Sequence, residues 1–159
     1  MAYCIDTSFW IKAWSDLYRP SKFPSIWENI GEMIAKNEIV SPMEVKNELK
    51  PKDKKVLAWL DARSSVFQEL NEKEQRYLTE LLGRFPNLVA EGITQPADPY
   101  VVAMAKIRGI TVVTDERPSG GMDLRKNPFA AKKIPDVCAA LEVPCLSVSE
   151  FINCLPGEL

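Results

Sequence analysis

Short apolar runs along the chain alternate with stretches in which apolar residues recur three and four positions apart. The runs Ala2–Ile5 and Ile110–Thr114 predict buried strands, and residues 38–40, 65–70 and 146–148 are weaker strand candidates. The stretches with helical spacing predict amphipathic helices between the strands. This alternation predicts a mostly parallel sheet of four or five strands with helices on both faces.

Local signals set the expected ends of several helices. Asn71 followed by Glu74 is a capping-box pattern, whereas Ser41 and Asp98 each precede a proline and are expected to cap the following helix. Gly109 is expected at the C-terminal end of a helix. The expected helices cover residues 9–17, 25–36, 41–49, 53–63, 71–82, 98–109 and 134–141, with a short last helix capped by Ser149.

The composition narrows the possible chemistry, because the chain of 159 residues contains no histidine. This excludes a histidine general base, a histidine-based catalytic triad and a histidine-ligated zinc site. Hydrolytic chemistry must therefore use carboxylates, hydroxyls, thiols or lysines. A net charge of −2 allows nucleic-acid binding only through a local basic patch.

The cysteines and the N-terminus point to a cytoplasmic protein. The cysteines form no C-x-x-C pair, so neither a zinc ribbon nor a thioredoxin motif is present. Their apolar neighbours predict buried thiols, with a disulfide or a reactive thiol as the alternative. The first residues show no signal-peptide pattern, and no stretch approaches the ~20 apolar residues of a membrane span. The cysteines are Cys4, Cys138, Cys145 and Cys154.

Acidic residues follow the two clearest strands. Asp6 comes directly after the first strand, and Asp115 and Glu116 come directly after the strand that ends at Thr114. The carboxyl ends of parallel strands lie at one edge of a sheet, where ligands bind in this fold class. We therefore expect these carboxylates to lie close together, with Asp98 at the start of a helix as a further candidate.

Glu44 and Glu48 add two carboxylates one turn apart on the expected helix 41–49. Carboxylates gathered without lysine or arginine partners repel one another, and a hard cation such as Mg²⁺ or Mn²⁺ offsets that repulsion. Two such ions can activate water and stabilise the leaving oxygen in phosphodiester cleavage. On spacing alone, Asp6 and Asp98 could instead be helix caps, and the glutamates could form a solvated helix face.

Four segments in order resemble the PIN domain, the metal-dependent ribonuclease fold of VapC-type toxins and several RNA-processing nucleases. Together they extend over about residues 1–148, and each contains an acidic residue beside a strand or helix. The tail 133–138 resembles a less characterised branch of PIN-like proteins. The four segments are Ile5–Phe9, Ile39–Leu49, Ala97–Ala105 and Val112–Glu116.

The resemblance implies a three-layer α/β/α fold and a single PIN-like domain over residues 1–159. It implies an endoribonuclease that depends on Mg²⁺ or Mn²⁺ and is the toxin component of a toxin–antitoxin pair. The implied partners are RNA, a cognate antitoxin protein and a second copy of the chain, without a membrane.

Position by position, the resemblance assigns metal-binding carboxylates and the hydroxyls beside them. Asp6, Glu48 and Asp98 match the first three acidic residues of the family, with Glu44 as the alternative to Glu48. The family spacing selects Glu116 as the fourth, although that position is commonly aspartate and the preceding residue is the alternative. The implied catalytic residues are Asp6, Thr7, Glu48, Asp98, Thr114, Asp115 and Glu116.

Basic residues follow the acidic pair in the segment 117–133, which is expected to be irregular. Phosphates beyond the metal site need lysine or arginine contacts, and such contacts make affinity fall with salt. This segment leaves the expected active-site strand, so it can border the cleft; the alternative is a solvated loop. A second supply is the run of lysines at 50, 52, 54 and 55. The expected substrate-binding residues are Arg117, Arg125, Lys126, Lys132 and Lys133.

Two other functions stay open. A catalytically inactive PIN-like domain that binds RNA or protein is favoured by glutamate, in place of aspartate, at position 116. A phosphohydrolase of the haloacid dehalogenase type would use Asp6 as its nucleophile. That chemistry needs a second acid two residues later, where the chain has Ser8, so this class ranks below the nuclease.

Overall fold

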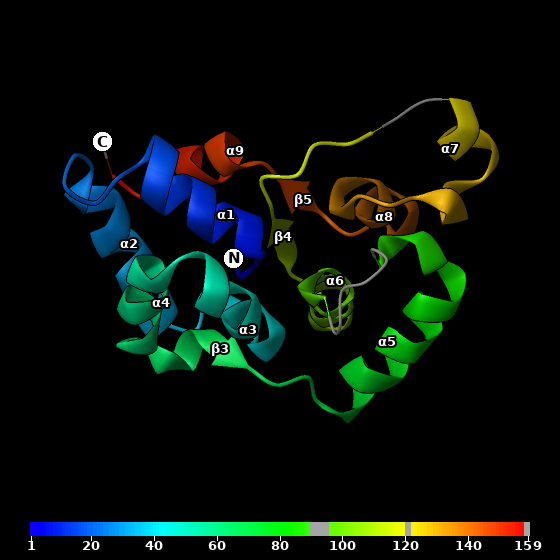
Figure 1. Cartoon of the computed structure of the whole chain (residues 1–159), viewed down its shortest axis with the longest axis horizontal. Coiled ribbons are helices and arrows are strands. Elements are labelled where there is room, and N and C mark those ends of the chain that lie inside the picture. Colours follow the sequence, from blue (N-terminus) through cyan, green and yellow to red (C-terminus); the bar gives the residue numbers. More distant parts are fainter. Residues whose placement is uncertain (90–95, 120–121, 158–159) are drawn as a thin grey trace.

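The computed structural model describes residues 1–89, 96–119 and 122–157. Figure 1 shows helices on both sides of a central sheet. The strands are β1 (Tyr3–Ile5), β2 (Ile39–Pro42), β3 (Phe67–Gln68), β4 (Thr111–Val113) and β5 (Cys145–Leu146). The α-helices are α1 (Thr7–Lys12), α2 (Pro24–Ala35), α3 (Met43–Lys52), α4 (Lys54–Asp61), α5 (Glu72–Arg84), α6 (Ala97–Arg108), α7 (Met122–Lys126), α8 (Ile134–Leu141) and α9 (Val148–Asn153). Shorter elements are the π-helix η1 (Ala13–Leu17) and the 3₁₀ turns η2 (Ser64–Val66), η3 (Pro86–Leu88) and η4 (Pro128–Ala130).

The sheet is parallel throughout its described strands, in the order β3-β2-β1-β4-β5. β1 lies at the centre, and Ile5 at its end pairs with Val113 of β4. The chain adds β2 and β3 on one side of β1 and then crosses to the other side for β4 and β5. β1 and β4 therefore flank the point where the strand order reverses, which is where open α/β sheets bind ligands. The predicted parallel three-layer α/β architecture is confirmed.

Helices from different parts of the chain cover the two faces of the sheet. α6 packs against β1, β2 and β4, and α5 and α8 pack against α6. α1, α2 and α9 lie on the other side of the sheet in Figure 1. Edge-on aromatic contacts hold this second layer: the ring centroid of Phe151 lies 5.2 Å from that of Phe9 and 5.0 Å from that of Tyr3. Burial of these large rings fixes α1, and the residue before it, against the sheet.

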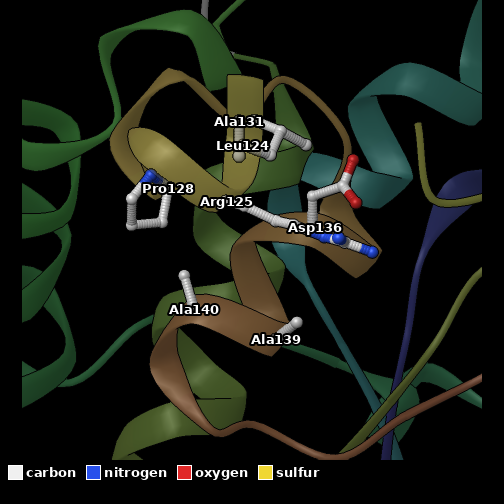
Figure 2. A pocket seen from close by; sticks show the side chains of 7 residues that line it. All are labelled: Leu124, Arg125, Pro128, Ala131, Asp136, Ala139 and Ala140. Atoms are coloured by element: carbon white, nitrogen blue, oxygen red, sulfur yellow. The ribbon is translucent and has the colours of Figure 1, made fainter. Parts of the chain in front are cut away.

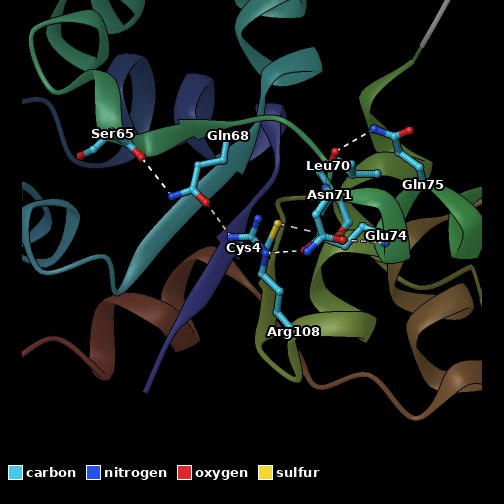
Figure 3. Close-up of polar contacts among 9 residues, drawn as sticks. Cys4, Ser65, Gln68, Leu70, Asn71, Glu74, Gln75 and Arg108 are labelled. Atoms are coloured by element: carbon cyan, nitrogen blue, oxygen red, sulfur yellow. Dashed lines mark hydrogen bonds and ion pairs between the residues drawn. The ribbon is translucent and has the colours of Figure 1, made fainter.

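An ion pair between the buried Glu74 and the partly buried Arg108 anchors the C-terminal end of α6 (Figure 3). Glu74 is fully buried, and its Oε1 accepts a hydrogen bond from Nε of Arg108 at 2.6 Å. Arg108 also donates to Oε1 of Gln68 at 2.7 Å, and Glu74 forms the predicted capping box with Asn71. Gly109 ends α6 with a φ of 66°, as its position predicted.

The expectation that Ser41 caps a helix is wrong. Ser41 lies in β2, and α3 begins only at Met43. The Ser41 hydroxyl donates to the carbonyl oxygen of Ile5 at 2.6 Å and accepts from Nε1 of Trp10 at 3.1 Å. The side chain therefore joins β2 to β1 and α1, because buried polar groups on those elements need a partner.

Three further local expectations need correction. α6 begins at Ala97, so Asp98 lies inside the first turn instead of capping the helix. The last helix is capped by Ser147 and not Ser149, because Ser147 completes a capping box with the glutamate three residues later. The segment 117–133, expected to be irregular, contains α7 and η4.

In the part of the chain that the structure describes, no helix is long and apolar enough to cross a membrane. The cysteines are free thiols. Cys4 and Cys138 are buried, as predicted, and Cys145 is partly buried. Cys154 is exposed, because it follows the last turn of α9 at the surface, so the prediction of burial is wrong for this residue.

Candidate active site

Asp6 leaves the end of β1 and is held by two hydroxyls. Its backbone N–H donates to the carbonyl oxygen of Val113 at 3.0 Å, which continues the contact between β1 and β4. Its Oδ2 accepts hydrogen bonds from Oγ of Ser8 at 2.6 Å and Oγ1 of Thr114 at 2.8 Å. Burial raises the pKa of Asp6, the two hydroxyls lower it, and the nearby charge of Glu48 raises it. Asp6 occupies the N-cap position of α1, as the alternative predicted, but its side chain makes no capping hydrogen bond to the helix and is free to face the other acids.

The same hydroxyls join the ends of β1 and β4 into one network. Oγ of Ser8 lies 3.1 Å from Oγ1 of Thr114 and accepts a hydrogen bond from the backbone N–H of Asp115 at 2.9 Å. Oγ1 of Thr114 accepts from the backbone N–H of Glu116 at 3.1 Å. Sequence reasoning selected Thr114 but missed Ser8. The signal that could have found it is a second hydroxyl within two residues of a strand-end aspartate.

Glu48 reaches the same place from α3. Oγ1 of Thr7, at the start of α1, donates to Oε1 of Glu48 at 2.7 Å. Glu48 and Asp6 line one pocket, whereas Glu44 does not line it. Oε2 of Glu44 is instead buried without a hydrogen-bond partner among the described residues. The pKa of Glu44 is raised, mainly by burial and to a smaller extent by the negative charge of Glu69. The structure thus places Glu48, and not Glu44, beside Asp6.

Asp98 enters from the first turn of α6. Its pKa is raised to about 8, first by burial and then by the negative charges of Asp6, Glu116 and Glu48. Lys133 acts in the opposite direction and lowers this pKa. Like charges raise the pKa of a carboxyl only when they lie near it, which agrees with the finding that these carboxylates, from four segments of the chain, line one pocket.

Glu116 lines the same pocket as the other acidic residues and also makes a structural hydrogen bond. Its Oε2 accepts a hydrogen bond from the backbone N–H of Ile134, the first residue of α8, at 2.9 Å. Burial raises the pKa of Glu116, the hydrogen bond from Ile134 lowers it, and the charge of Asp6 raises it. Asp115 lines the same pocket, so both members of the acidic pair face it.

These residues line one open pocket of about 480 Å³, named here the acid pocket. Five of its carboxylates come from the predicted set, and a sixth belongs to Asp16, which pairs with Lys12 at 3.2 Å. Its lining residues are Asp6, Thr7, Ser8, Ile11, Lys12, Asp16, Glu48, Lys52, Asp98, Asp115 and Glu116.

The donor chemistry of the acid pocket fits a hard divalent cation. Ion pairs formed by the described residues leave out Asp6, Glu48, Asp98 and Glu116, so these carboxylates have no salt-bridge partner there. Carboxylate oxygens are the ligands that Mg²⁺ and Mn²⁺ prefer. No three acidic or cysteine side chains in the described ranges are spaced as a ready-made metal site, so a bound cation would have to draw the carboxylates together.

The predicted substrate-binding residues do not line the acid pocket. Arg125 instead lines a pocket between α7 and α8, shown in Figure 2. The lysines that line the acid pocket are Lys12 of α1 and Lys52 of α3. Lys52 belongs to the predicted run of lysines at 50, 52, 54 and 55. Lys12 was not predicted, because its position in the sequence indicates only that it lies on the polar face of a helix. The residues that lie outside the acid pocket are Arg117, Arg125, Lys126, Lys132 and Lys133.

A solved structure shares this fold. It is the crystal structure of VapBC2 from Rickettsia felis bound to a DNA fragment from their promoter. The two chains are 16% identical with a TM-score of 0.51, and the match covers 92% of this chain and 98% of that chain. At this identity the likeness shows the fold alone. No curated protein sequence matches the chain.

A family model described as "Domain of unknown function (DUF4411)" matches residues 3–156. The match begins at the first residue of β1 and ends beyond α9, so it contains the whole sheet and every residue of the acid pocket. This chain therefore belongs to the DUF4411 family.

Proposed function

We propose that this chain is an endoribonuclease that depends on Mg²⁺ or Mn²⁺ and acts as the toxin component of a toxin–antitoxin pair. The observation that carries the proposal is the acid pocket. Its unpaired carboxylates come from the ends of β1 and β4 and from α3 and α6, and they gather where the strand order reverses. The four PIN-like motifs and the fold shared with a VapBC2 chain support the same class.

The residues that would hold the cation are the carboxylates of the acid pocket. When bound, a divalent cation polarises a phosphoryl oxygen and lowers the pKa of a water molecule, which supplies the nucleophile without a histidine base. The protein itself contributes several carboxylates that lie close together in a partly buried pocket. These residues are Asp6, Glu48, Asp98 and Glu116, with Asp115 beside them.

Hydroxyls and lysines complete the site. Ser8 orients Asp6 and Thr7 orients Glu48 through the hydrogen bonds described above, and such outer partners hold ligand carboxylates in one orientation. Lys12 and Lys52 line the same pocket, where their ammonium groups can contact phosphates of the bound strand.

The test is RNA cleavage by the Asp98→Asn variant in Mg²⁺ and in Mn²⁺. Loss of even an outer partner of a metal ligand costs about 10- to 100-fold in affinity or activity, so loss of a ligand should lower cleavage by more than about 100-fold. Asp16→Asn is the matched control, because Asp16 lines the pocket but pairs with Lys12. Equal cleavage by the wild-type chain and Asp98→Asn, or no cleavage by the wild-type chain, would refute the proposal.

The toxin role has a separate test in cells. Expression of the wild-type chain in a bacterium should arrest growth, and expression of Asp98→Asn should not. Co-expression of a cognate antitoxin should restore growth and yield a complex that purifies as one species. Growth arrest by Asp98→Asn at equal expression would show that toxicity does not come from the acid pocket.

A second candidate is a PIN-like domain that binds RNA or protein without cutting. It is favoured by the hydrogen bond from Ile134 to Glu116, which already engages one carboxylate, and by the absence of a ready-made metal triad among the described residues. Calorimetry with Mn²⁺ separates the two functions. Binding that Asp98→Asn abolishes supports the nuclease, whereas RNA binding without Mn²⁺ binding supports the second candidate.

A further inference from the structure

A second pocket adjoins the acid pocket at Glu116. It has a volume of about 390 Å³, and Glu116 lines both pockets. Thr114, whose hydroxyl donates to Asp6, also lines it. This second pocket, named here the side pocket, lies beside the edge strand β5 and α8. Its lining residues are Thr114, Glu116, Pro118, Pro135, Asp136, Ala139, Val143, Cys145, Leu146, Ser147 and Glu150.

The walls of the side pocket suit a flat ring. Pro118, Pro135 and Leu146 provide apolar surface, and the volume falls in the range of about 300–1,000 Å³ that small-molecule sites occupy. Protein pockets that accept a single nucleobase hold it between apolar or aromatic side chains and read its edge by hydrogen bonds.

The charged groups of the side pocket are carboxylates, and in each of them one oxygen already accepts a hydrogen bond within the fold while the other has none among the described residues. The carboxylates of Glu116, Asp136 and Glu150 line it. An ionised carboxylate can accept hydrogen bonds but cannot donate them. Guanine, adenine and cytosine each carry an exocyclic amino group that donates. Uracil has no exocyclic amino group, and its one donor on this edge, N3–H, lies between two carbonyl oxygens that carboxylates repel.

Two lysines distinguish the acid pocket from the side pocket. Lys12 and Lys52 line the acid pocket but not the side pocket. A strand whose scissile phosphate lies at the carboxylates can therefore place neighbouring phosphates near the lysines. The next nucleotide in the other direction then meets the side pocket.

We propose that the side pocket binds the base of a nucleotide next to the cleaved phosphodiester, and that it selects a base with an exocyclic amino group over uracil. The inference rests on the proposed ribonuclease function and adds a specificity site to it. Because Glu116 lines both pockets, a ligand in the side pocket lies next to a strand bound at the acid pocket, which favours a base of that strand as the occupant.

Two neighbouring alanines of α8 provide a matched test. Both alanines line the pocket of Figure 2, but only Ala139 also lines the side pocket, so Ala140→Trp controls for changes in the pocket of Figure 2. Figure 2 shows their methyl groups pointing to different sides of α8. Both residues are exposed, so Ala139→Trp and Ala140→Trp add the same bulk at equal cost to the helix. Only the first should fill the side pocket. Equal thermal midpoints would show that both variants fold, and Ala139→Leu replaces the tryptophan variant if they differ.

The experiment compares short RNAs that differ in one base on either side of a mapped cleavage position. For the wild-type chain and Ala140→Trp, uracil at one flanking position should lower kcat/KM about tenfold. Ala139→Trp should abolish this difference and raise KM for the preferred RNA. Fluorescence anisotropy in an Asp98→Asn background should show weaker RNA binding for Ala139→Trp than for Ala140→Trp without any cleavage.

The outcomes separate the specificity site from the proposed function. Two outcomes would overturn the proposed role of the side pocket but not the proposed nuclease function. One is cleavage by the wild-type chain without any base preference, and the other is equal base preference in both tryptophan variants. Absence of cleavage by the wild-type chain overturns the nuclease itself. If Ala139→Trp loses an antitoxin protein but keeps base selection, the pocket docks a protein and the inference is overturned.

Discussion

The acid pocket and the ion pair between the buried Glu74 and Arg108 both take carboxylates out of water, but in opposite ways. Glu74 is 0% exposed and has a guanidinium at 2.6 Å, a capping-box N–H donor and no neighbouring carboxylate in the network of Figure 3. Asp6 is 2% exposed and has two hydroxyl donors, a nearby Glu48 and no salt-bridge partner among the described residues.

The difference separates structural from functional carboxylates in this molecule. A buried charge is costly unless it is paired and hydrogen-bonded, and Glu74 meets both conditions. The predicted carboxylates of the acid pocket lack an ion-pair partner among the described residues, and burial, followed by the negative charges of its neighbours, raises the pKa of Asp98, although Lys133 acts against this rise. Neighbouring buried carboxylates without an ion-pair partner are typical of a functional site that binds a positively charged ligand.

Replacing Arg108 by methionine should have the largest effect on stability. The change leaves Glu74 buried without its cation, and removing one partner of a buried pair costs about 3–5 kcal/mol of unfolding free energy. Urea unfolding measures this loss. Arg84→Met is the control, since it removes an exposed pair with Glu80 that is worth about 0–1 kcal/mol. Equal losses in the two variants would erase the distinction between buried and exposed pairs.

Replacing Thr114 by valine should lower metal affinity and RNA cleavage by about 10- to 100-fold, because Thr114 is an outer partner of Asp6. The stability loss should be about 2 kcal/mol, because the buried hydroxyl makes two hydrogen bonds, one to Asp6 and one from the backbone N–H of Glu116, each worth about 1 kcal/mol. Mn²⁺ calorimetry and cleavage rates check the first part, and urea unfolding checks the second. Thr111→Val, at the start of β4, should change none of these quantities. If Thr114→Val costs stability but not metal affinity, Thr114 is a structural residue only.

Replacing Asp98 by asparagine should stabilise the metal-free protein at high pH. The pKa of Asp98 is about 8 in the folded chain, against about 3.9 when unfolded, so the unfolded chain loses its proton first. Wild-type stability in EDTA should therefore fall as the pH rises from about 4 to above about 8. Asp98→Asn removes this decline and should gain about 1 kcal/mol above that pH, while losing stabilisation by Mn²⁺.

Glu74→Gln sharpens this prediction, because it also removes a buried carboxylate but should lower stability at every pH. Urea midpoints of both variants at about pH 5 and about pH 9 make the comparison. A gain for Glu74→Gln, or a wild-type profile that rises through this window, would reverse the assignment of the two sites.

Several features depended on short-range pattern and were predictable. The capping box of Asn71 and Glu74 involves residues three apart, and the left-handed end of α6 needs only Gly109. The place of Asp6 and the 115–116 pair at one edge of the sheet follows from parallel strands that end just before them. Such features involve few residues, so tertiary packing had little room to change them.

Side-chain partners across the fold could not be read in this way. From the sequence, the hydroxyl of Ser41 could cap a helix or join two strands. Its burial between Ile5 and Trp10 selects the second role, because both residues hydrogen-bond to it. Glu44 and Glu48 are indistinguishable by spacing. The packing of α3 against α1 decided between them, because it brings Thr7 within 2.7 Å of Glu48.

The sequence by itself determined the alternation of strands and helices, the exclusion of histidine chemistry and the set of acids that could form a site. Only the tertiary structure decided which acids share a pocket, that Lys12 and Lys52 line it, and that a side pocket adjoins it at Glu116. The physical reason is the sequence separation over which each kind of information acts. Hydrophobic periodicity acts over a few residues, whereas the pocket joins residues as far apart as Thr7 and Glu116, and their proximity depends on how whole elements pack.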